Sequence, residues 1–532
     1  MSGNKYSQRK DAGEIFQRKD AKVAKSAKEY WVMKLFRFIH CLGLRRVATD
    51  EGVFPRQSAR HKSGSQTHPC HSNPRGNTGS ISNSKDTTRI LPKAFLCVLR
   101  DHCVFALTAC FLTLSTTATA APDIQHWQTR NGVRVFFVTA AELPIVDVRV
   151  VFAAGSARDD GKPGIAQLSN GLLSEGADGL DADAIAQRFE GLGAQFGSGI
   201  DRDMAWVSLR SLSEARLVAP ALDMLAKLLR HPDFPAQAFE RERQRMLIAL
   251  QEQEEKPEQI AENAFYKALY GNHPYAMPPE GTVDSLKALT RDDVQGFHKQ
   301  YYVAHNALIA IVGALDRKGA EQLAETVAGS LPEGAAAPAL PVVKELAAAE
   351  AIRKQHPSTQ THVYVGQPGL ARGDADYFAL YVANHVLGGS GLVSRLSDEI
   401  REKRGLSYSV YSYFFPMAQK GPFLMGLQTR NDQADEAQRL LRETLAKYRE
   451  EGPSDTELTA AKRNITGGFP LRIDSNSKIL EYLSVIGYYN LPLDYLDTFS
   501  KNIEAVTREQ AHTAFKRRVQ ADKLVSVRVG GP

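Results

Sequence analysis

The chain's 532 residues are too many for one ordinary domain, and this length predicts two to four domains. The net charge of +6 is unevenly distributed, because residues 1–97 hold 19 Lys and Arg against 7 Asp and Glu, whereas residues 122–532 hold 46 against 52. Proteins that bind nucleic acid normally keep their positive charge in the folded part, so the acidic body argues against a nucleic-acid partner.

Residues 1–97 are rich in Ser, Asn, Lys and Arg. Such a composition cannot bury enough apolar surface to fold, which predicts a disordered leader. Because signal peptides lie at N-termini and one follows this segment, we favour an over-extended reading frame, with translation beginning near Leu96 or Val98 at a non-ATG codon; the disordered leader is the expectation if the segment is real.

Residues 98–121 have the three parts of a secretory signal peptide: Arg100, the apolar run Val104–Thr116 and a stretch of small residues. The apolar run is too short to span a membrane comfortably. It therefore predicts export to the periplasm, a mature chain beginning near Pro122 and no membrane span after cleavage. Two alternatives are a buried core segment and lipidation at Cys110, which ends a stretch that resembles a lipoprotein acylation site.

The body, residues 122–532, contains none of the five cysteines, so it has no disulfide, thiolate nucleophile or cysteine-based metal site. Short runs with alternating apolar residues predict strands, and longer runs with helical spacing predict amphipathic helices. The predicted strands are 133–138, 146–152, 204–209 and 361–365, and the predicted helices are 182–192, 214–229, 236–253 and 434–451. Because strands and helices do not alternate strictly, the pattern favours an α+β fold over a doubly wound sheet.

The body contains an internal repeat. Thr290 and Thr507 are each placed to cap a helix that begins with acidic residues. Each Thr is followed 23 residues later by a glycine that ends an apolar strand, Gly313 in the first copy and Gly530 in the second. Two copies of the same helix and strand predict a duplicated unit.

Between the two copies, residues 332–350 begin as an Ala- and Pro-rich segment that is typical of a linker. We therefore predict two domains, at 122–331 and 351–532. Each is expected to be a mostly antiparallel sheet packed with helices, and the two are expected to face each other across the linker.

Several stretches of the body carry a family resemblance. In the first half these are Ala154–Asp159 and Gly164–Ala166, and in the second half they are Gly388–Val410 and Gly468–Asn476. In this order they resemble the pitrilysin/insulinase family of zinc peptidases, and the resemblance covers essentially all of residues 125–530.

Zinc catalysis in this family requires His-x-x-Glu-His on one helix and a distant Glu. The histidines bind zinc, the intervening Glu activates the bound water, and the distant Glu completes the ligands. The aligned residues here are Gln167, Asn170 and Gly171, and Ala249 stands at the position of the distant Glu. None of these four side chains can perform its role. The resemblance therefore implies a degenerate site, with no metal or other cofactor in this chain.

The remaining histidines do not offer a replacement site, because no pair lies at i and i+4 beside an acidic residue. We expect surface or core positions for His273, His298, His305, His356, His362 and His385. An autonomous metallopeptidase with relocated ligands is the alternative.

The second half retains another element of the family. Arg401 lies seven residues before Tyr408, which resembles the Arg/Tyr pair that the family turns toward the zinc. The resemblance implies that these side chains hold the substrate backbone and stabilise the tetrahedral intermediate, and both are suitable donors to a developing oxyanion. Arg404 has the wrong spacing to Tyr408. The alternative is a surface Arg and a core Tyr.

Gly191–Arg202 resembles the turn and edge strand at which the family adds a peptide substrate as an extra strand. Together these features predict the zinc-less subunit of an exported heterodimeric zinc metalloendopeptidase. A sibling subunit would supply the zinc, and Arg401 and Tyr408 would act in trans on an unfolded peptide. The alternative is a structural or peptide-binding scaffold without a catalytic role, as in the family's respiratory-complex core subunits.

Overall fold

The computed structural model describes residues 122–531. The predicted leader at 1–97, the predicted signal peptide at 98–121 and all five cysteines lie outside this range. Among the described residues, no helix is long and apolar enough to cross a membrane.

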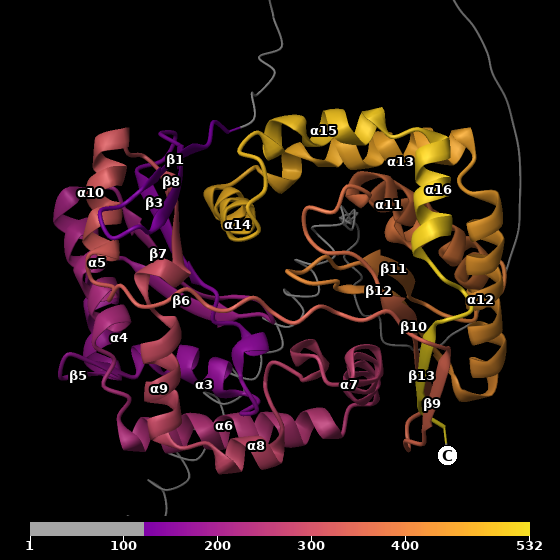
Figure 1. Ribbon diagram of the computed structural model, residues 1–532, viewed down its shortest axis with the longest axis horizontal. Helices are drawn as coiled ribbons and strands as arrows, with labels where there is room; N and C mark the ends of the chain where they lie inside the picture. The colour runs from indigo at the N-terminus through magenta and orange to yellow at the C-terminus, as the bar shows by residue number, and fades with distance from the viewer. Residues whose placement is uncertain (1–121, 532) are drawn as a thin grey trace, which may run out of the picture. The chain divides into compact units, whose positions relative to one another are not determined.

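The first half is built on a six-stranded sheet with the order β1-β2-β8-β3-β7-β6 (Figure 1). The strands are β1 (Gln125–Gln128), β2 (Arg134–Thr139), β3 (Ile145–Phe152), β6 (Gln195–Ile200), β7 (Ala205–Leu212) and β8 (Ala307–Gly313). Neighbours are antiparallel except β2 and β8, which are parallel. Every residue of β8 is buried, which explains its unbroken apolar sequence.

Eight helices and a short hairpin complete the first half as described. The helices are α3 (Ile165–Gly171), α4 (Ala182–Gly191), α5 (Ala215–Arg230), α6 (Ala236–Glu254), α7 (Pro257–Tyr270), α8 (Val283–Ala288), α9 (Arg291–Tyr301) and α10 (Arg317–Ala328), and the hairpin is β4 (Gly176–Ala177) with β5 (Leu180–Asp181). One face of the sheet packs on α5 and α10, because Val135 and Phe137 of β2 share a core with Leu225 and Ala324.

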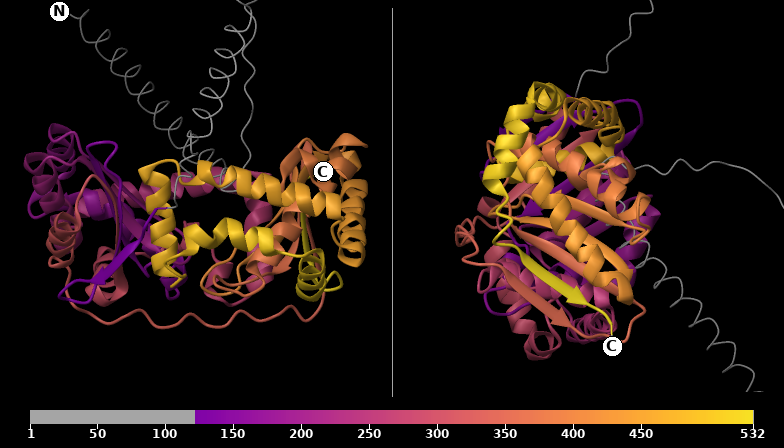
Figure 2. Two further views of the ribbon diagram at one scale, coloured as in Figure 1. Left: turned by 90° about the horizontal axis from the view of Figure 1, so that it is seen from above. Right: turned by 90° about the vertical axis from the view of Figure 1, so that its right-hand side faces the viewer.

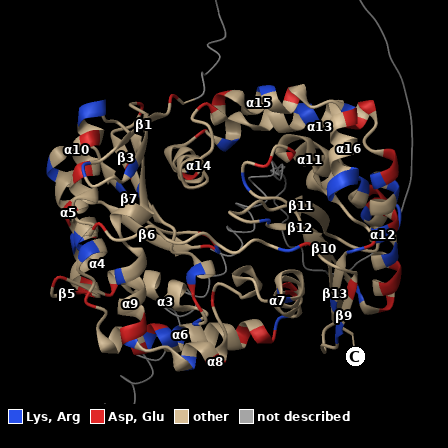
Figure 3. Cartoon of the chain, viewed as in Figure 1, with Lys and Arg blue, Asp and Glu red and all other residues tan. Residues whose placement is uncertain are grey.

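The second half is built on a five-stranded sheet with the order β11-β12-β10-β13-β9. The strands are β9 (Glu350–Lys354), β10 (Gln360–Pro368), β11 (Val410–Phe414), β12 (Pro422–Arg430) and β13 (Val525–Val529), and the helices are α11 (Tyr377–Asn384), α12 (Ala434–Glu451), α13 (Asp455–Gly468), α14 (Asn476–Tyr488), α15 (Tyr495–Ala505) and α16 (Arg508–Arg518). Only the β13–β9 pair is parallel. Figure 3 shows Lys and Arg interspersed with Asp and Glu along α12.

The predicted α+β fold with two duplicated, mostly antiparallel sheets is confirmed. The predicted strands and helices occur close to the expected bounds. Thr290 accepts a hydrogen bond from the Asp293 backbone at the start of α9, and Thr507 accepts one from Gln510 at the start of α16, so both predicted helix caps are confirmed.

Each sheet is covered on its second face by a helix from the other half. Phe136 and Val138 of β2 share a core with Leu483 of α14, which comes from the second half. Tyr364 of β10 shares a core with Phe265 of α7, which comes from the first half. Because neither half covers both faces of its own sheet, we expect the two halves to fold as one cooperative unit.

We call α7 and α14 the exchanged helices, because each covers the sheet of the other half. A glycine allows each of them to approach that sheet closely. A Cβ atom on Gly487 of α14 would lie 2.6 Å from the Phe136 ring. A Cβ atom on Gly366 of β10 would lie 2.0 Å from the Phe423 carbonyl and 2.8 Å from the Phe265 ring. A larger side chain at Gly487 would therefore push α14 away from the sheet, and one at Gly366 would clash both with the backbone of β12 and with α7.

The segment between α10 and β9 contains no regular element at residues 332–346 and runs in an extended form (Figure 2). It is packed rather than free, because Leu340 and Val343 are buried in the core that contains α7. The carbonyl of Pro338 accepts a hydrogen bond from Arg158, and the carbonyl of Pro341 is 2.9 Å from His273 Nε2.

Candidate functional site

The degenerate metal positions that the sequence resemblance assigned to one helix, Gln167, Asn170 and Gly171, lie on α3. It begins after Gly164, whose φ of +93° favours glycine. The Asp159 carboxylate accepts backbone hydrogen bonds from Gly164 (2.8 Å) and Ala166 (3.1 Å), which satisfies two amides at the start of the helix. Burial raises the pKa of Asp159 to about 8 despite these donors.

Asn170, at the position of the general base, is part of the core. Its side chain is 2% exposed, and its amide nitrogen donates to the Tyr302 hydroxyl (3.1 Å) and the Trp206 carbonyl (3.3 Å). Burial raises the pKa of Tyr302, so its hydroxyl keeps its proton. Asn170 therefore connects α3 to β7 and to the end of α9, which is a structural role.

The other three metal positions have no groups that could bind zinc together. Gln167 and Gly171 are partly exposed on α3, and a Cβ atom on Gly171 would meet open space. Ala249 is exposed on α6. An amide, a hydrogen and a methyl group do not fit the ligand set of zinc, which takes His, Cys or carboxylate side chains. In residues 122–531, no group of three His, Cys, Asp or Glu is arranged to hold a metal ion.

Arg401 and Tyr408 lie together in the second half. Arg401 is in a π-helical turn, Ser397–Glu402, and its Cζ atom is 4.9 Å from the centre of the Tyr408 ring. The Tyr408 side chain is 71% exposed, and that of Arg401 is 29% exposed with its Nε atom 3.3 Å from Glu402. The pair is therefore neither a lone surface Arg nor a core Tyr, and the phenol is accessible to a ligand.

Hydrogen bonds fix the loop that carries Tyr408. The Ser407 hydroxyl lies 2.7 Å from the carbonyls of both Ser409 and Gln428, and the Leu406 carbonyl accepts from the Thr429 hydroxyl. The phenol is therefore exposed, while the backbone that carries it is held by hydrogen bonds. A hydrogen-bond donor that is oriented before the reaction needs such a fixed backbone.

Arg404 has a different environment. Its Nη1 atom donates to the Glu399 carbonyl (2.7 Å) and carboxylate (2.8 Å). This Arg is therefore committed to a local ion pair, and it provides a natural control for Arg401.

β6 lies at the edge of the first sheet, as the sequence predicted for Gly191–Arg202. Among the described strands it pairs only with β7, in an antiparallel register from Gln195 opposite Arg210 to Ile200 opposite Ala205. Its other edge is the side at which an additional strand can pair.

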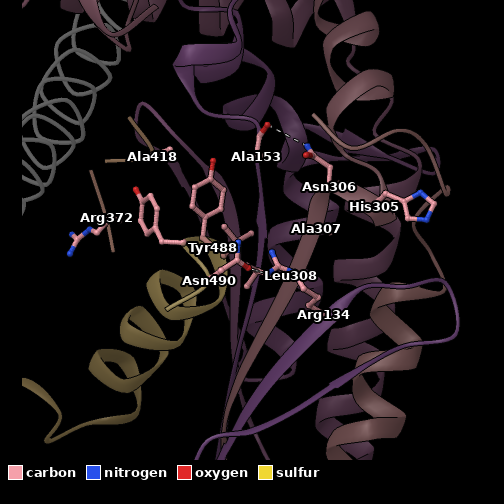
Figure 4. A pocket seen from close by; sticks show the side chains of 12 residues that line it. Arg134, Ala153, His305, Asn306, Ala307, Leu308, Arg372, Ala418, Tyr488 and Asn490 are labelled. Atoms are coloured by element: carbon pink, nitrogen blue, oxygen red, sulfur yellow. Dashed lines mark hydrogen bonds between the residues drawn. The ribbon is translucent and has the colours of Figure 1, made fainter. Parts of the chain in front are cut away.

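A cavity of about 340 Å³ lies between the first sheet and the end of α14, and sequence reasoning did not predict it (Figure 4). Arg134, Asn306 and Tyr488 are among its lining residues, and Arg134 donates to the Gly487 carbonyl (2.8 Å) and Asn490 Oδ1 (2.5 Å). None of the six predicted site residues lines this cavity. It forms only because segments far apart in the sequence meet there, so no local signal could have revealed it.

Two family models match the chain. The model described as "Insulinase (Peptidase family M16)" matches residues 134–283, and the model described as "Peptidase M16 inactive domain" matches residues 288–465. A solved structure of a peptidase M16 inactive domain from Pseudomonas fluorescens is 41% identical in sequence. The match covers 77% of this chain and 98% of that one, with a TM-score of 0.74. The chain belongs to the insulinase family, M16.

Relatives within M16 carry names that differ about activity. "Uncharacterized zinc protease YmxG" of Bacillus subtilis (strain 168) is 27% identical over 358 residues, which is 67% of this chain and 86% of that protein. "Non-peptidase homolog YmxG" of Helicobacter pylori (strain ATCC 700392 / 26695) is 25% identical over 431 residues, which is 80% of this chain and 97% of that protein. The four aligned positions of this chain lack zinc-binding side chains and a general base, which fits a zinc-less M16 member.

Two histidines of the M16 body, the buried His385 and the partly buried His298, pack against other side chains. Burial lowers the pKa of His385 to about 4, and its ring is 3.1 Å from Asn464 Oδ1. Burial likewise lowers the pKa of His298 to about 4, and its ring stacks on Tyr302 at 4.9 Å. Neutral, packed imidazoles of this kind support the core rather than a relocated metal site.

Proposed function

We propose that this chain is the non-catalytic subunit of an exported, heterodimeric M16 zinc metalloendopeptidase. Its Arg401 and Tyr408 would act on an unfolded peptide held at the zinc of a sibling subunit. The observation that carries the proposal is the contrast between the two halves. The metal positions have become a core amide, two small residues and a partly exposed Gln, whereas Arg401 and Tyr408 remain stacked and accessible.

The chemistry of the pair suits a transition state rather than a ground state. Peptide hydrolysis places negative charge on the former carbonyl oxygen, and a guanidinium and a phenol can both donate to it. Donors that are already oriented need no reorganisation when the charge develops, and removing one such donor typically costs about 2.7–4 kcal/mol. The hydrogen bonds of the neighbouring Ser407 hold the backbone at Tyr408, which supports such an orientation of the phenol.

Peptide binding would use the exposed edge of β6. Backbone pairing to an edge strand needs few specific side chains, so this capacity is independent of the zinc ligands. The substrate class is therefore an extended, unfolded peptide segment.

The test is turnover of a fluorogenic unfolded peptide by this chain assembled with a zinc-bearing M16 sibling. Arg401→Ala is expected to lower kcat by about a hundred- to a thousandfold, since a donor to the oxyanion is lost. Tyr408→Phe keeps the ring on Arg401 and removes only the hydroxyl, so it isolates the phenol as a donor. Arg404→Ala is the matched control and is expected to change kcat far less.

Assembly must be measured on the same samples, by size-exclusion chromatography with light scattering. Equal turnover of the Arg401→Ala and wild-type heterodimers would reject the shared site. In that case a peptide-binding or structural scaffold, in keeping with the name of the H. pylori relative, would be the function that remains.

Export is the part of the proposal that rests on residues 98–121, which lie outside the described range. Terminal sequencing of periplasmic material is expected to begin at Ala121 or Pro122. A first residue before Val98 in that material would contradict cleavage of a signal peptide.

A further inference from the structure

The turn between β6 and β7 contains a carboxylate that is bound from both halves of the chain. Asp203 is 2% exposed. Its Oδ1 atom accepts from the Tyr275 hydroxyl (2.5 Å), and its Oδ2 atom accepts from the Tyr489 hydroxyl (2.8 Å) and the Ala418 backbone (2.7 Å). Tyr275 belongs to the first half, whereas Tyr489 and Ala418 belong to the second.

The backbone around this carboxylate is bound in the same way. The Tyr488 hydroxyl donates to the Asp203 carbonyl (2.7 Å), and the Tyr275 hydroxyl accepts from the backbone of Gln419 (3.1 Å). Tyr275 therefore relays the contact, since it donates to the first half and accepts from the second. We call Asp203, Tyr275, Tyr488, Tyr489 and Ala418 the Asp203 clamp.

The neighbouring residue adds a second attachment. The Arg202 guanidinium lies 3.8 Å from the centre of the Tyr266 ring on α7, and its Nε atom donates to the Tyr275 carbonyl (3.2 Å). A cation over an aromatic face is stabilised by the ring quadrupole, and more strongly where water is excluded. The turn is thereby held against α7, the helix that covers the second sheet.

The loop that leads to α3 lies against the same turn. The Ala157 amide donates to the Arg202 carbonyl (2.8 Å), and a Cβ atom on Gly155 would lie 2.4 Å from the Met204 nitrogen. No larger residue fits at Gly155 without moving the turn. The turn therefore contacts the metal-helix entry, α7 and the end of α14 at once.

We infer that Asp203 is a positioning residue that fixes the edge strand β6 to the second half of the chain. β6 ends at Ile200, three residues before Asp203, so movement of the turn is transmitted directly to the strand. A peptide added at β6 would be held at a constant position relative to Arg401 and Tyr408. The clamp rests on the contacts above, whereas its role in peptide binding rests on the proposed function.

The first test is hydrogen–deuterium exchange of the full chain with Asp203→Asn. The amide keeps one acceptor but places an N–H₂ group beside existing donors, so the turn should open locally. We expect amides of residues 195–204 to exchange at least tenfold faster, with little change in β3 and β8. Tyr489→Phe and Tyr275→Phe each remove one hydrogen-bond donor to Asp203, and they replace Asp203→Asn in this test if that variant does not fold.

The matched control is Asp147→Asn. Asp147 is a second carboxylate buried in the same sheet, 4% exposed, and it receives two hydrogen bonds from Arg210 (2.7 and 3.0 Å). This variant should loosen β3 and β7 without selective exchange at the turn. The clamp would be contradicted if residues 195–204 of the Asp203→Asn variant exchanged as slowly as in the wild type. It would also be contradicted if both Asp variants showed the same pattern of exchange.

The second test is turnover by the heterodimer. Asp203→Asn should raise KM for the peptide at least fivefold with kcat changed less than twofold, the reverse of Arg401→Ala. Faster exchange with an unchanged KM would overturn the positioning role. If no zinc-bearing sibling gives turnover with the wild-type chain, the proposed function fails instead, and the exchange result alone decides the clamp.

Discussion

His385 should make the stability of this protein depend on pH in a way that can be isolated. The side chain is buried at the end of α11, and burial together with the nearby Arg472 charge lowers its pKa to about 4. The unfolded chain has an ordinary histidine pKa of about 6.5. The fold therefore favours the neutral ring, so the stability that this group contributes is complete above pH 6.5. It is lost as the pH falls toward 4.

The expected magnitude follows from these two pKa values. At pH 5 the unfolded histidine is almost fully protonated, whereas the folded one is mostly neutral. The difference corresponds to about 1.5 pKa units, or about 2 kcal/mol, relative to pH 7.5. This is a large share of the 5–15 kcal/mol that is typical for the unfolding of a protein.

The assay is urea denaturation of wild type and His385→Gln at pH 7.5 and pH 5. The variant should lose about 2 kcal/mol less than wild type over this interval, because Gln does not titrate. Comparing the two proteins cancels the contributions that other titratable groups make to the pH dependence of stability. One of these is Asp159, whose pKa is raised to about 8 and whose contribution therefore changes in the opposite direction over this interval.

The non-titrating control is Tyr448→Phe. It removes a 2.7 Å hydrogen bond to the Ala383 carbonyl, two residues before His385. Its effect should be about 1 kcal/mol and equal at both pH values, since a neutral hydrogen bond carries no pH dependence here. If His385→Gln and wild type lose the same free energy between pH 7.5 and pH 5, the buried neutral histidine is refuted.

Three further predictions concern the exchanged helices and the degenerate site. Gly487→Ala should lower the free energy of unfolding by about 1–3 kcal/mol, because its Cβ atom would overpack against Phe136. The control is Gly467→Ala in α13, where the added Cβ meets open space and the change should be neutral or stabilising. A stabilised Gly487→Ala variant would contradict the close packing of α14. Asn170→Ala should lower the free energy of unfolding, measured by urea denaturation, by about 1–3 kcal/mol, because Tyr302 and Trp206 each lose a hydrogen-bond partner. The control Gln167→Ala should change it by no more than about 0.5 kcal/mol. Equal effects of the two variants would contradict the structural role of Asn170. Elemental analysis of the purified chain should find no stoichiometric zinc, and chelator should leave its melting temperature unchanged, whereas a chelator-sensitive midpoint would point to relocated ligands.

The sequence was sufficient where the signal is local. Helix periods, strand alternation and the capping Thr290 and Thr507 depend on residues within a turn or two of one another, so the elements and the duplication could be predicted. The loss of zinc chemistry at Gln167, Asn170 and Gly171 was also readable, because residue types alone decide whether a ligand or base is present. The spacing of Arg401 and Tyr408 could also be seen in the sequence, but their 4.9 Å stacking is a finding of the structure.

Only the tertiary structure decided what these residues do for the fold. Asn170 could be identified from the sequence as a lost base, but its bond to Tyr302 spans 132 residues. The contact between Asp203 and Tyr488 spans 285 residues, and neither residue carries a local signal for the other. The exchange of α7 and α14 between the sheets is of the same kind, since both helices have ordinary amphipathic patterns. Which apolar face covers which sheet depends on long-range packing, and periodicity shows only that a face exists.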